Sequence, residues 1–433
     1  MVLAVEPESF EFRKYPSTRD AKVKNVYTWL AGKQNDDDVD NLWRIHDKLY
    51  DLSVWIDLHP GGSEWISVTR GTDITEAFEV HHPNIDLARK MLKQYEVKPT
   101  QNIRNSPFTF EKGGFYDTVR ERAYPVIKRV GSGPTKAMNA IADSIFILFL
   151  MLSLLAVYFG SILLSLVSGV SLAMLCVCAH NYFHKKNNWR MFYFDCGMLS
   201  SHEWRISHAL SHHLFANTLL DVEVSAIEPL LQFLPKEQKS VIARFMVILY
   251  SNIIYWIILP LQFTMKWVGV ARGKVQARKE NFLPLLHLIL CLAVGLCSHS
   301  LSRVFVCWLL IHMACSYWFV FVGLIAAHHH PDIWHHGDEL RYKSNDWGIR
   351  QIEAVRDRKD VTGNLFLVVT LFGDHTLHHL FPTVDHSKLK HLYPVLLETC
   401  QEFNIDFELY SIPSLLIGKY QQLARNQPRK FSP

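Results

Sequence analysis

The chain has 433 residues, which is long enough for two or three domains. Its 45 basic and 41 acidic residues nearly balance, so its charge gives no indication of a nucleic-acid partner. Hydrophobic residues make up 49% of the chain and gather in a few long blocks, which predicts a membrane protein with soluble parts. The segment Met1–Glu8 is too short and too acidic for a signal peptide, so we expect the chain to start in the cytosol.

Residues 23–98 alternate short apolar runs with polar turns, as a small soluble domain does. At their centre lies His59, which is followed by a proline and a pair of glycines that force a tight turn. A pair of histidines, His81 and His82, follows further along. Two histidines on opposing loops, with apolar residues between them, can clamp a flat macrocycle from both faces. Iron held in this way has no open position and carries electrons only.

Residues 99–141 form a predicted linker that is punctuated by proline and glycine. Within it, the segment 115–124 has helical periodicity, and we expect this helix to lie along a membrane surface. Lys128, Arg129 and Lys136 then precede the first apolar block, which indicates a cytosolic flank.

The first apolar block, residues 145–179, is too long for one membrane span, and Gly160 near its middle predicts a hairpin. Three further apolar segments follow, at 245–263, 282–297 and 304–327. If His213 and His328 serve one site, they must lie on the same side of the membrane. The chain between them must then cross the membrane an even number of times. We therefore expect the last two segments to form a second hairpin and residues 245–263 to dip into one leaflet only.

Histidines recur in clusters along this apolar half of the chain. The clusters are His180 with His184, then His208, His212 and His213, then the run His328–His330, and finally His375, His378 and His379. On a helix, residues four apart share one face, so His208 and His212 should point the same way, with His213 reaching a second atom nearby. Imidazole is a good ligand for transition metals, and eight or nine nitrogens exceed the four to six that one ion takes. The pattern predicts two metal ions.

Both halves of the chain resemble known families. The segment Tyr50–Leu52, the His-Pro-Gly-Gly turn and the segment Gly71–Phe78 resemble a cytochrome b5 domain. The histidine clusters resemble the three boxes of the membrane fatty-acid desaturase superfamily, over roughly residues 142–400. The fold implied is multidomain. A small α+β haem domain at 23–98 follows an N-terminal arm at 1–22 and precedes an all-α, membrane-embedded desaturase domain at 142–433, with about four transmembrane helices and a cytosolic helical cap.

The resemblance also implies the ligands of both cofactors, a haem b and two iron ions. His59 and His82 would hold the haem iron, with His81 as the alternative to His82. The implied ligands of the iron pair are His180, His184, His208, His212, His213, His328, His375, His378 and His379.

Several neighbouring residues have supporting or alternative roles. The motif Ala326-Ala327-His328 resembles the end of the fourth transmembrane helix of acyl desaturases, where a further ligand lies, and His329 or His330 would be its substitute. His335 and His336 are expected on a solvated loop. The candidate carboxylates that orient the imidazoles are Asp374, Asp221 and Glu223.

The activity implied is that of a membrane-bound, oxygen-dependent diiron acyl-lipid desaturase that receives electrons from its own cytochrome b5 domain. Its expected partners are a fatty acyl lipid or acyl-CoA, molecular oxygen, NADH-cytochrome b5 reductase and the bilayer of the endoplasmic reticulum, with the haem domain and the boxes facing the cytosol. The third box begins with His375, whereas desaturases with a fused cytochrome b5 domain that act near the carboxyl end usually have glutamine there. The double-bond position therefore does not follow. A hydroxylase of the same superfamily, or a non-catalytic haem electron-transfer protein with a degenerate desaturase half, are the alternatives.

Overall fold

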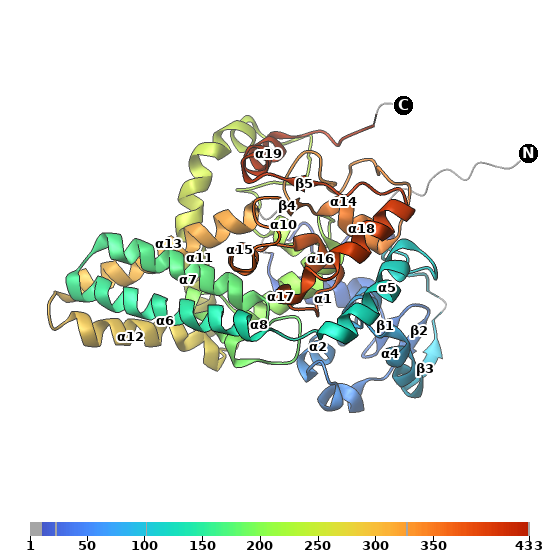
Figure 1. Cartoon of the computed structure of the whole chain (residues 1–433), viewed down its shortest axis with the longest axis horizontal. Coiled ribbons are helices and arrows are strands. Elements are labelled where there is room, and N and C mark those ends of the chain that lie inside the picture. The colour runs from blue at the N-terminus through green and yellow to red at the C-terminus, as the bar shows by residue number, and fades with distance from the viewer. Residues whose placement is uncertain (1–10, 22–23, 101, 326–327, 432–433) are drawn as a thin grey trace, which may run out of the picture.

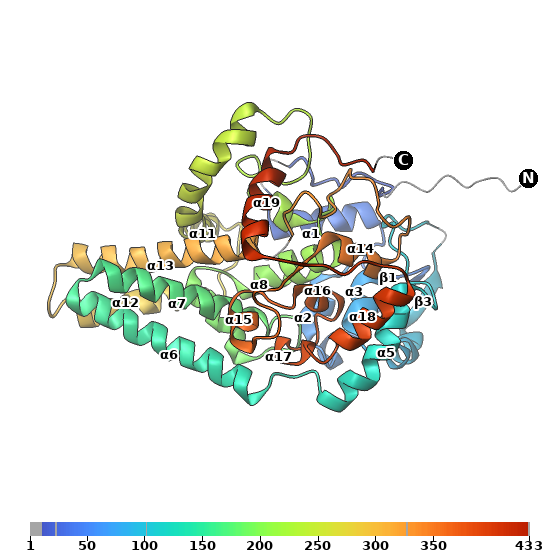
Figure 2. The ribbon, with the colours of Figure 1, turned by 45° about the horizontal axis from the view of Figure 1, so that its top comes forward.

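A computed structural model describes residues 11–21, 24–100, 102–325 and 328–431 of the chain. A bundle of long helices projects from one side of a mixed body that contains the remaining helices and all the strands (Figure 1). The N-terminal domain lies away from the tip of this bundle (Figures 1 and 2). The segment Met1–Glu8 and the Ala326-Ala327 pair, on which two sequence predictions depend, lie outside the described residues.

The N-terminal domain is built on a three-stranded antiparallel sheet in the order β1-β2-β3. Its elements are α1 Val26–Asp37, β1 Trp43–Ile45, β2 Lys48–Tyr50, α2 Ser63–Val68, α3 Thr75–His81, α4 Ile85–Leu92 and β3 Glu96–Pro99. Trp43 on β1 is fully buried, and its indole N–H donates to the carbonyl of Ile66 at 3.0 Å, which ties the sheet to α2. Phe78 packs in the same core, so α3 is held against the sheet.

The bundle contains two helical hairpins and one oblique helix. These helices are α6 Lys136–Phe159, α7 Ile162–His180, α11 Val247–Ala271, α12 Leu283–Gly295 and α13 Leu301–Leu324. Gly160 ends α6 in the left-handed region at φ 59°, and the Ser161 side chain then caps α7 by accepting from the Leu164 N–H. The predicted first hairpin is confirmed. Arg303, at the start of α13, donates to the Gly160 carbonyl at 2.9 Å, so the two hairpins turn at the same end of the bundle.

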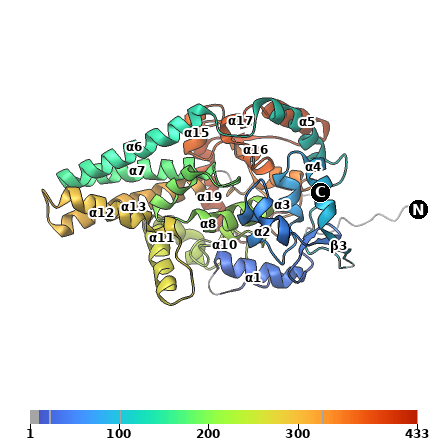
Figure 3. The ribbon, with the colours of Figure 1, turned by 90° about the horizontal axis from the view of Figure 1, so that it is seen from below.

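Among the described residues, four helical stretches are long and apolar enough to cross a membrane, namely Lys136–Phe159, Ile162–His180, Ile242–Ala271 and Leu301–Leu324. The third is longer at both ends than the predicted apolar segment 245–263. Pro260 lies inside its helix α11, which leaves the bundle at a steep angle (Figure 3). The 13 residues of α12 span only about 20 Å at 1.5 Å per residue, less than the ~30 Å hydrocarbon core. The partial embedding of residues 245–263 stays a prediction.

A helical cap surrounds the ends of α7 and α13 that lie opposite the hairpin turns. It consists of α5 Phe115–Val130, α8 Ser201–Trp204, α9 His213–Phe215, α10 Val222–Ser225, α14 Trp347–Ala354, α15 Leu365–Thr370, α16 His375–Leu380, α17 His386–Leu389, α18 Tyr393–Glu402, α19 Ile412–Ala424 and the parallel pair β4 Asp357–Arg358 and β5 Leu409–Tyr410. Phe115, Tyr116 and Val119 of α5 are buried, and the Tyr116 hydroxyl donates to the Leu380 carbonyl at 3.2 Å. The apolar face of this helix therefore packs in the cap core, and its position relative to a membrane surface stays a prediction.

The contact between α7 and α13 generates a stability prediction. A Cβ on Gly169 of α7 would lie 2.4 Å from the Ile311 carbonyl and 2.5 Å from the Ala314 Cβ, whereas a Cβ on Gly323 of α13 would meet nothing within 4 Å. We expect Gly169→Ala to destabilise the protein by about 1–3 kcal/mol through overpacking. The same change at Gly323 should stabilise it by about 0.5–1 kcal/mol, since alanine favours the helix. Thermal unfolding in detergent measures both, and equal shifts of the midpoint would contradict the packing argument.

Candidate functional site

The nine predicted metal-binding histidines form two adjacent groups of buried side chains. The first group contains His180, His184, His208, His213 and His378, and the second contains His212, His328, His375 and His379. Within each group, one ligand atom from every residue lies within 4.8 Å of the others. The His213 and His379 rings stack with centroids 4.1 Å apart, so the two groups share a border.

Direct Nε2–Nε2 distances show how closely these rings converge. His180 and His208 are 2.8 Å apart, and His328 and His375 are 2.7 Å apart. Two nitrogens bound about 2.1 Å from one ion at right angles lie about 3 Å from each other, so the observed spacing suits ligands of one metal.

The middle histidine cluster divides between the two groups in a way that an α-helix does not predict. Arg205–His212 is a π-helix, in which the backbone N–H of His213 donates to the His208 carbonyl five residues earlier. This wider turn places His208 and His213 on one face, with their Nε2 atoms 3.0 Å apart. His212 instead turns to His328, at 3.1 Å between Nε2 atoms. His208 and His212 do point the same way, as predicted, since their rings stack with centroids 5.4 Å apart, but their Nε2 atoms serve different groups.

The last cluster divides in the same manner. On α16, His375 and His379 are four residues apart and join the second group, while His378 points to His180 of the first group at 3.0 Å. His328, which follows the end of α13 in the sequence, joins the second group. Of its possible substitutes, His329 stacks on Phe233 at 3.6 Å instead.

Hydrogen bonds to Nδ1 fix the orientation of four of these rings. His212 donates to Asp221 at 2.9 Å, and His208 to Glu223 at 3.2 Å. His379 donates to the Gln351 side chain at 3.0 Å, and His328 to the Ala354 carbonyl at 3.1 Å. A ring that donates from Nδ1 presents its Nε2 lone pair, which is the form that binds a metal.

The three predicted carboxylates have different roles. Asp221 and Glu223 meet imidazoles, as just described, whereas Asp374 accepts from the Tyr393 hydroxyl at 3.1 Å and from no histidine ring in the described part of the chain. Burial, together with the neighbouring carboxylate of Asp357, raises the pKa of Asp374 to about 7. Asp374 therefore supports the start of α16 and does not orient a ring.

Two further side chains at the site, Gln351 and His386, were not predicted from the sequence. Gln351 belongs to α14, far from any histidine box, and only the fold brings it to His379. The His386 ring lies 4.2 Å from that of His378, and both its nitrogens lack a partner in the described structure. His386 follows Asp385 and lies outside the histidine boxes, so the sequence did not mark it as a residue of the site. His335, predicted on a solvated loop, is fully buried, and its Nδ1 donates to the Ile333 carbonyl at 3.0 Å.

The histidines of the N-terminal domain form a separate site. The His59 and His82 rings face each other with centroids 6.1 Å apart. Each donates from Nδ1 to a backbone carbonyl, His59 to Gly62 at 3.0 Å and His82 to Phe78 at 2.8 Å, so both present Nε2 to the space between them. Two imidazoles that bound one iron from opposite faces would have ring centroids about 6 Å apart, since each nitrogen would lie about 2 Å from the metal and about 1 Å from its own ring centroid.

Apolar side chains near this pair are left open to solvent. Val54 is 74% exposed and Leu58 is 65% exposed, although both belong to a folded domain with a well-packed core. A flat apolar macrocycle between His59 and His82 would cover such surface. The donor set and the exposed apolar surface therefore fit a haem.

His81, the alternative to His82, points in another direction. Its Nδ1 donates to the Ala77 carbonyl at 2.9 Å, and its ring lies 5.9 Å from that of Trp65 and 6.4 Å from that of His184. Burial lowers the pKa of His81 to about 4, so the ring is neutral at physiological pH. It is a part-buried residue at the domain interface, facing the metal-binding groups.

Charged and aromatic contacts hold the N-terminal domain against the cap. The Glu64 carboxylate on α2 accepts from His202 and Arg205, and the Arg205 guanidinium lies 5.1 Å from the centroid of the Trp65 ring. Burial raises the pKa of Glu64, but the hydrogen bond of His202 and the charge of Arg205 outweigh it and hold the pKa at about 2. The contact therefore keeps its charge across the physiological range.

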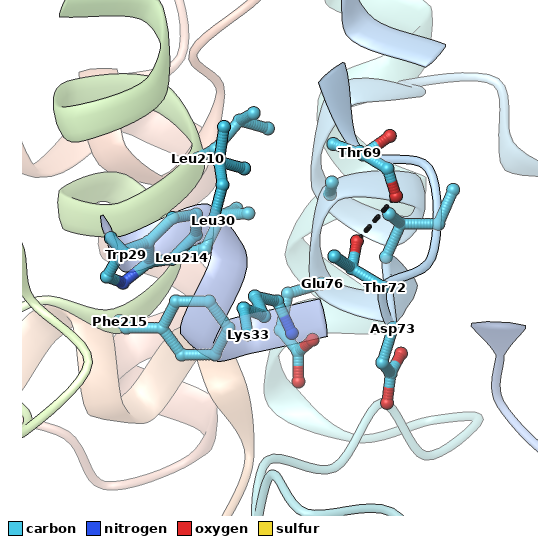
Figure 4. Close-up of a pocket in the computed structure, with 12 residues that line it drawn as sticks. Trp29, Leu30, Lys33, Thr69, Thr72, Asp73, Glu76, Leu210, Leu214 and Phe215 are labelled. Atoms are coloured by element: carbon cyan, nitrogen blue, oxygen red, sulfur yellow. Dashed lines mark hydrogen bonds between the residues drawn. The ribbon is translucent and has the colours of Figure 1, made fainter. Parts of the chain in front are cut away.

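A small pocket marks the same interface on the far side of α3. Figure 4 shows Trp29 and Phe215 on one side of it, and Thr69 and Thr72 on the other. The indole N–H of Trp29 donates to the Leu220 carbonyl at 2.8 Å, so α1 joins the domain to the segment behind the π-helix. None of the predicted ligands lines this pocket, which we read as a packing gap between the domains.

Comparison with known proteins agrees with these two sites. The profile described as "Fatty acid desaturase" matches residues 153–410, and "Cytochrome b5-like Heme/Steroid binding domain" matches residues 28–99. The chain belongs to the fatty acid desaturase family, whose members are oxidoreductases, and carries an N-terminal cytochrome b5 domain. The resemblance proposed from the motifs is confirmed.

Individual relatives share this two-part organisation along nearly their whole length. "Cytochrome b5-related protein" of Drosophila melanogaster is 37% identical over 429 residues, covering 97% of this chain and 96% of the relative. "Delta(5) fatty acid desaturase A" of Dictyostelium discoideum is 25% identical over 436 residues, covering 91% and 92%. "Fatty acid desaturase 3" of Bos taurus is 22% identical over 419 residues, covering 88% and 89%. No solved structure matches the chain.

The contrast between two buried carboxylates gives a test of ring orientation. In Asp221→Asn, the charge that holds the Nδ1 proton of His212 is lost, and we expect iron affinity to fall by about 10- to 100-fold. In Asp374→Asn, no ring loses a partner, so iron affinity should stay near that of the wild type. Iron content after dialysis against graded chelator measures both. Equal iron loss in the two variants would show that the carboxylate of Asp221 has no special role.

Proposed function

We propose that the protein is a membrane-bound, oxygen-dependent acyl-lipid desaturase that holds two iron ions in its histidine groups and is reduced by its own haem b domain. The observation that carries this proposal is the convergence of nine buried imidazoles into two adjacent groups, of five and four residues, beside a docked cytochrome b5 domain. Relatives named as fatty acid desaturases share this arrangement of domains over about nine-tenths of the chain.

The proposed ligands of the haem iron are His59 and His82, and those of the iron pair are the nine histidines of the two groups. When bound, the iron pair supplies the oxygen activation that removes hydrogen from an unactivated methylene, which acid–base side chains cannot do. The protein holds the rings in place through Asp221, Glu223 and Gln351, and keeps the groups buried, which excludes water from them.

The proposed substrate is a fatty acyl chain on a lipid or on coenzyme A. The ends of α7 and α13 that carry His180 and precede His328 are the ends of apolar helices, so an acyl chain in the bilayer reaches the histidine groups from within the membrane. We place the cap and the haem domain on the cytosolic side of the endoplasmic reticulum, because Lys185, Lys186 and Arg190 follow α7. NADH-cytochrome b5 reductase is the proposed electron source.

Expression in a desaturase-deficient yeast strain tests the activity. We expect the wild-type chain to add unsaturated acyl chains to the lipid profile, and His212→Ala to abolish them because the second group loses a ligand. His391→Ala, which removes an exposed histidine of the same cap, is the matched control and should behave as wild type. Gas chromatography of the lipids detects the products. A hydroxylated product would identify the chain as a hydroxylase, and an unchanged profile in all strains would refute both enzymes.

Haem absorbance separates the two candidate axial ligands. His59→Ala and His82→Ala should each lose the spectrum of six-coordinate low-spin haem, since one axial nitrogen is missing. His81→Leu should keep it, because this ring faces His184 and not His59. Loss of that spectrum in the His81 variant, with retention in the His82 variant, would reverse the assignment.

The iron content decides between an enzyme and a non-catalytic haem protein. The proposal requires two iron ions in addition to the haem iron in each chain, since the two groups are separate sets of ligands. Mass spectrometry measures the total iron and absorbance measures the haem, so together they give the ratio of iron to haem in each chain. Haem without additional iron would leave only the electron-transfer alternative.

A further inference from the structure

We propose that His81 is the side chain through which electrons pass from the haem to the iron pair. This inference rests on the proposed function, and it assigns a role to the residue that neither site uses as a ligand. His81 follows Val80 at the end of α3 and directly precedes His82, so one peptide unit joins it to the proposed haem ligand.

The position of the His81 ring supports this role. Its centroid lies 6.4 Å from that of His184, with an angle of 26° between the two ring planes. His184 belongs to the first metal-binding group. A continuous path therefore runs from the haem ligand His82, through one peptide unit and one aromatic ring, to a ligand of the iron pair.

The hydrogen bonds of the two rings agree with a close approach when metal is present. The Nε2 atom of His81 and both ring nitrogens of His184 are buried and have no partner in the described structure. A histidine that binds a metal through one nitrogen normally donates from the other. The Nε2 atom of His81, whose Nδ1 already donates to Ala77, is left without a partner on the side of the molecule where the His184 ring lies.

The interface holds this path in one geometry. Trp65 packs beside His81 and against Arg205, which also pairs with Glu64. On the other side of α3, the Arg120 guanidinium of α5 donates to the Glu79 carboxylate at 2.7 Å, and both side chains are buried. The C-terminal end of α3 is thus held to the cap by Glu79 and lies beside the contacts of Trp65, so the distance between the rings of His81 and His184 does not depend on a diffusional encounter.

The electron balance of the step is simple. One electron leaves the ferrous haem iron, which becomes ferric, and arrives at one ferric ion of the pair, which becomes ferrous. No bond forms or breaks at His81, and no proton leaves it. A second transfer follows once the reductase has reduced the haem again.

The experiment measures this transfer directly, in full-length protein loaded with haem and iron, without oxygen and without lipid substrate. The haem is reduced within microseconds by a light-activated flavin, and its reoxidation by the iron pair is followed by visible absorption. We compare His81→Leu, which fills the space without an aromatic ring, with His81→Phe, which keeps a ring. Leu87→Ala is the control, since Leu87 lies in the same domain and its side chain is exposed.

We expect reoxidation to be slowed roughly tenfold to a hundredfold in His81→Leu, because the ring that brings the two centres together is gone. His81→Phe should be faster than the leucine variant, and the control should match the wild type. Haem content, iron content and the haem reduction potential should be unchanged in all of them. A purely structural role would instead change those three quantities. If leucine reduces cofactor content, His81→Met provides the non-aromatic comparison.

An unchanged reoxidation rate in the non-aromatic variant would overturn the inference and leave the proposed function intact. Wild-type haem that is never reoxidised anaerobically by the iron pair would overturn both. Rapid transfer in the wild type together with no lipid product in yeast would refute the desaturase activity while leaving the electron path supported.

Discussion

The burial of many imidazoles at one place is the constraint on which the rest of the structure depends. Neutral imidazole carries one donor and one acceptor, and nitrogens brought as close as those of His328 and His375, at 2.7 Å, cannot all be satisfied by one another. Burying such groups without partners is unfavourable. The proposed pair of iron ions would resolve the conflict and would link the end of α7, the π-helix, His328 and α16 into one unit. Stability and metal loading are coupled in sites of this kind.

The spacing of the boxes was enough to predict the participants of this site but not their partition. His208, His212 and His213 were identified from the sequence alone, yet their division between two groups follows from a π-turn, and no local pattern distinguishes a π-turn from an α-helix. Gln351 was missed for a different reason, because its partner His379 is 28 positions away and only tertiary packing brings them together.

Membrane and interfacial predictions depended on apolar periodicity, which does not say what covers an apolar face. The helix α5 was predicted on a membrane surface, and its apolar face lies in the cap core, where Trp347 and Tyr116 pack with ring centroids 4.7 Å apart. The first hairpin was predictable because Gly160 and Ser161 carry local signals, a left-handed turn and a cap. Local turns and helix caps could thus be predicted from the sequence, whereas packing partners distant in the chain could not.

The contacts of Glu64, Trp65 and Trp29 place the cytochrome b5 domain permanently beside its acceptor. A free cytochrome must find its acceptor by diffusion, so reduction slows when the membrane is crowded or the carrier is scarce. Within one chain the donor and acceptor have a fixed stoichiometry and a fixed effective concentration. In the proposed enzyme, turnover per molecule would be insensitive to how sparsely the protein is distributed in its bilayer, and it would not compete with other users of a shared cytochrome pool.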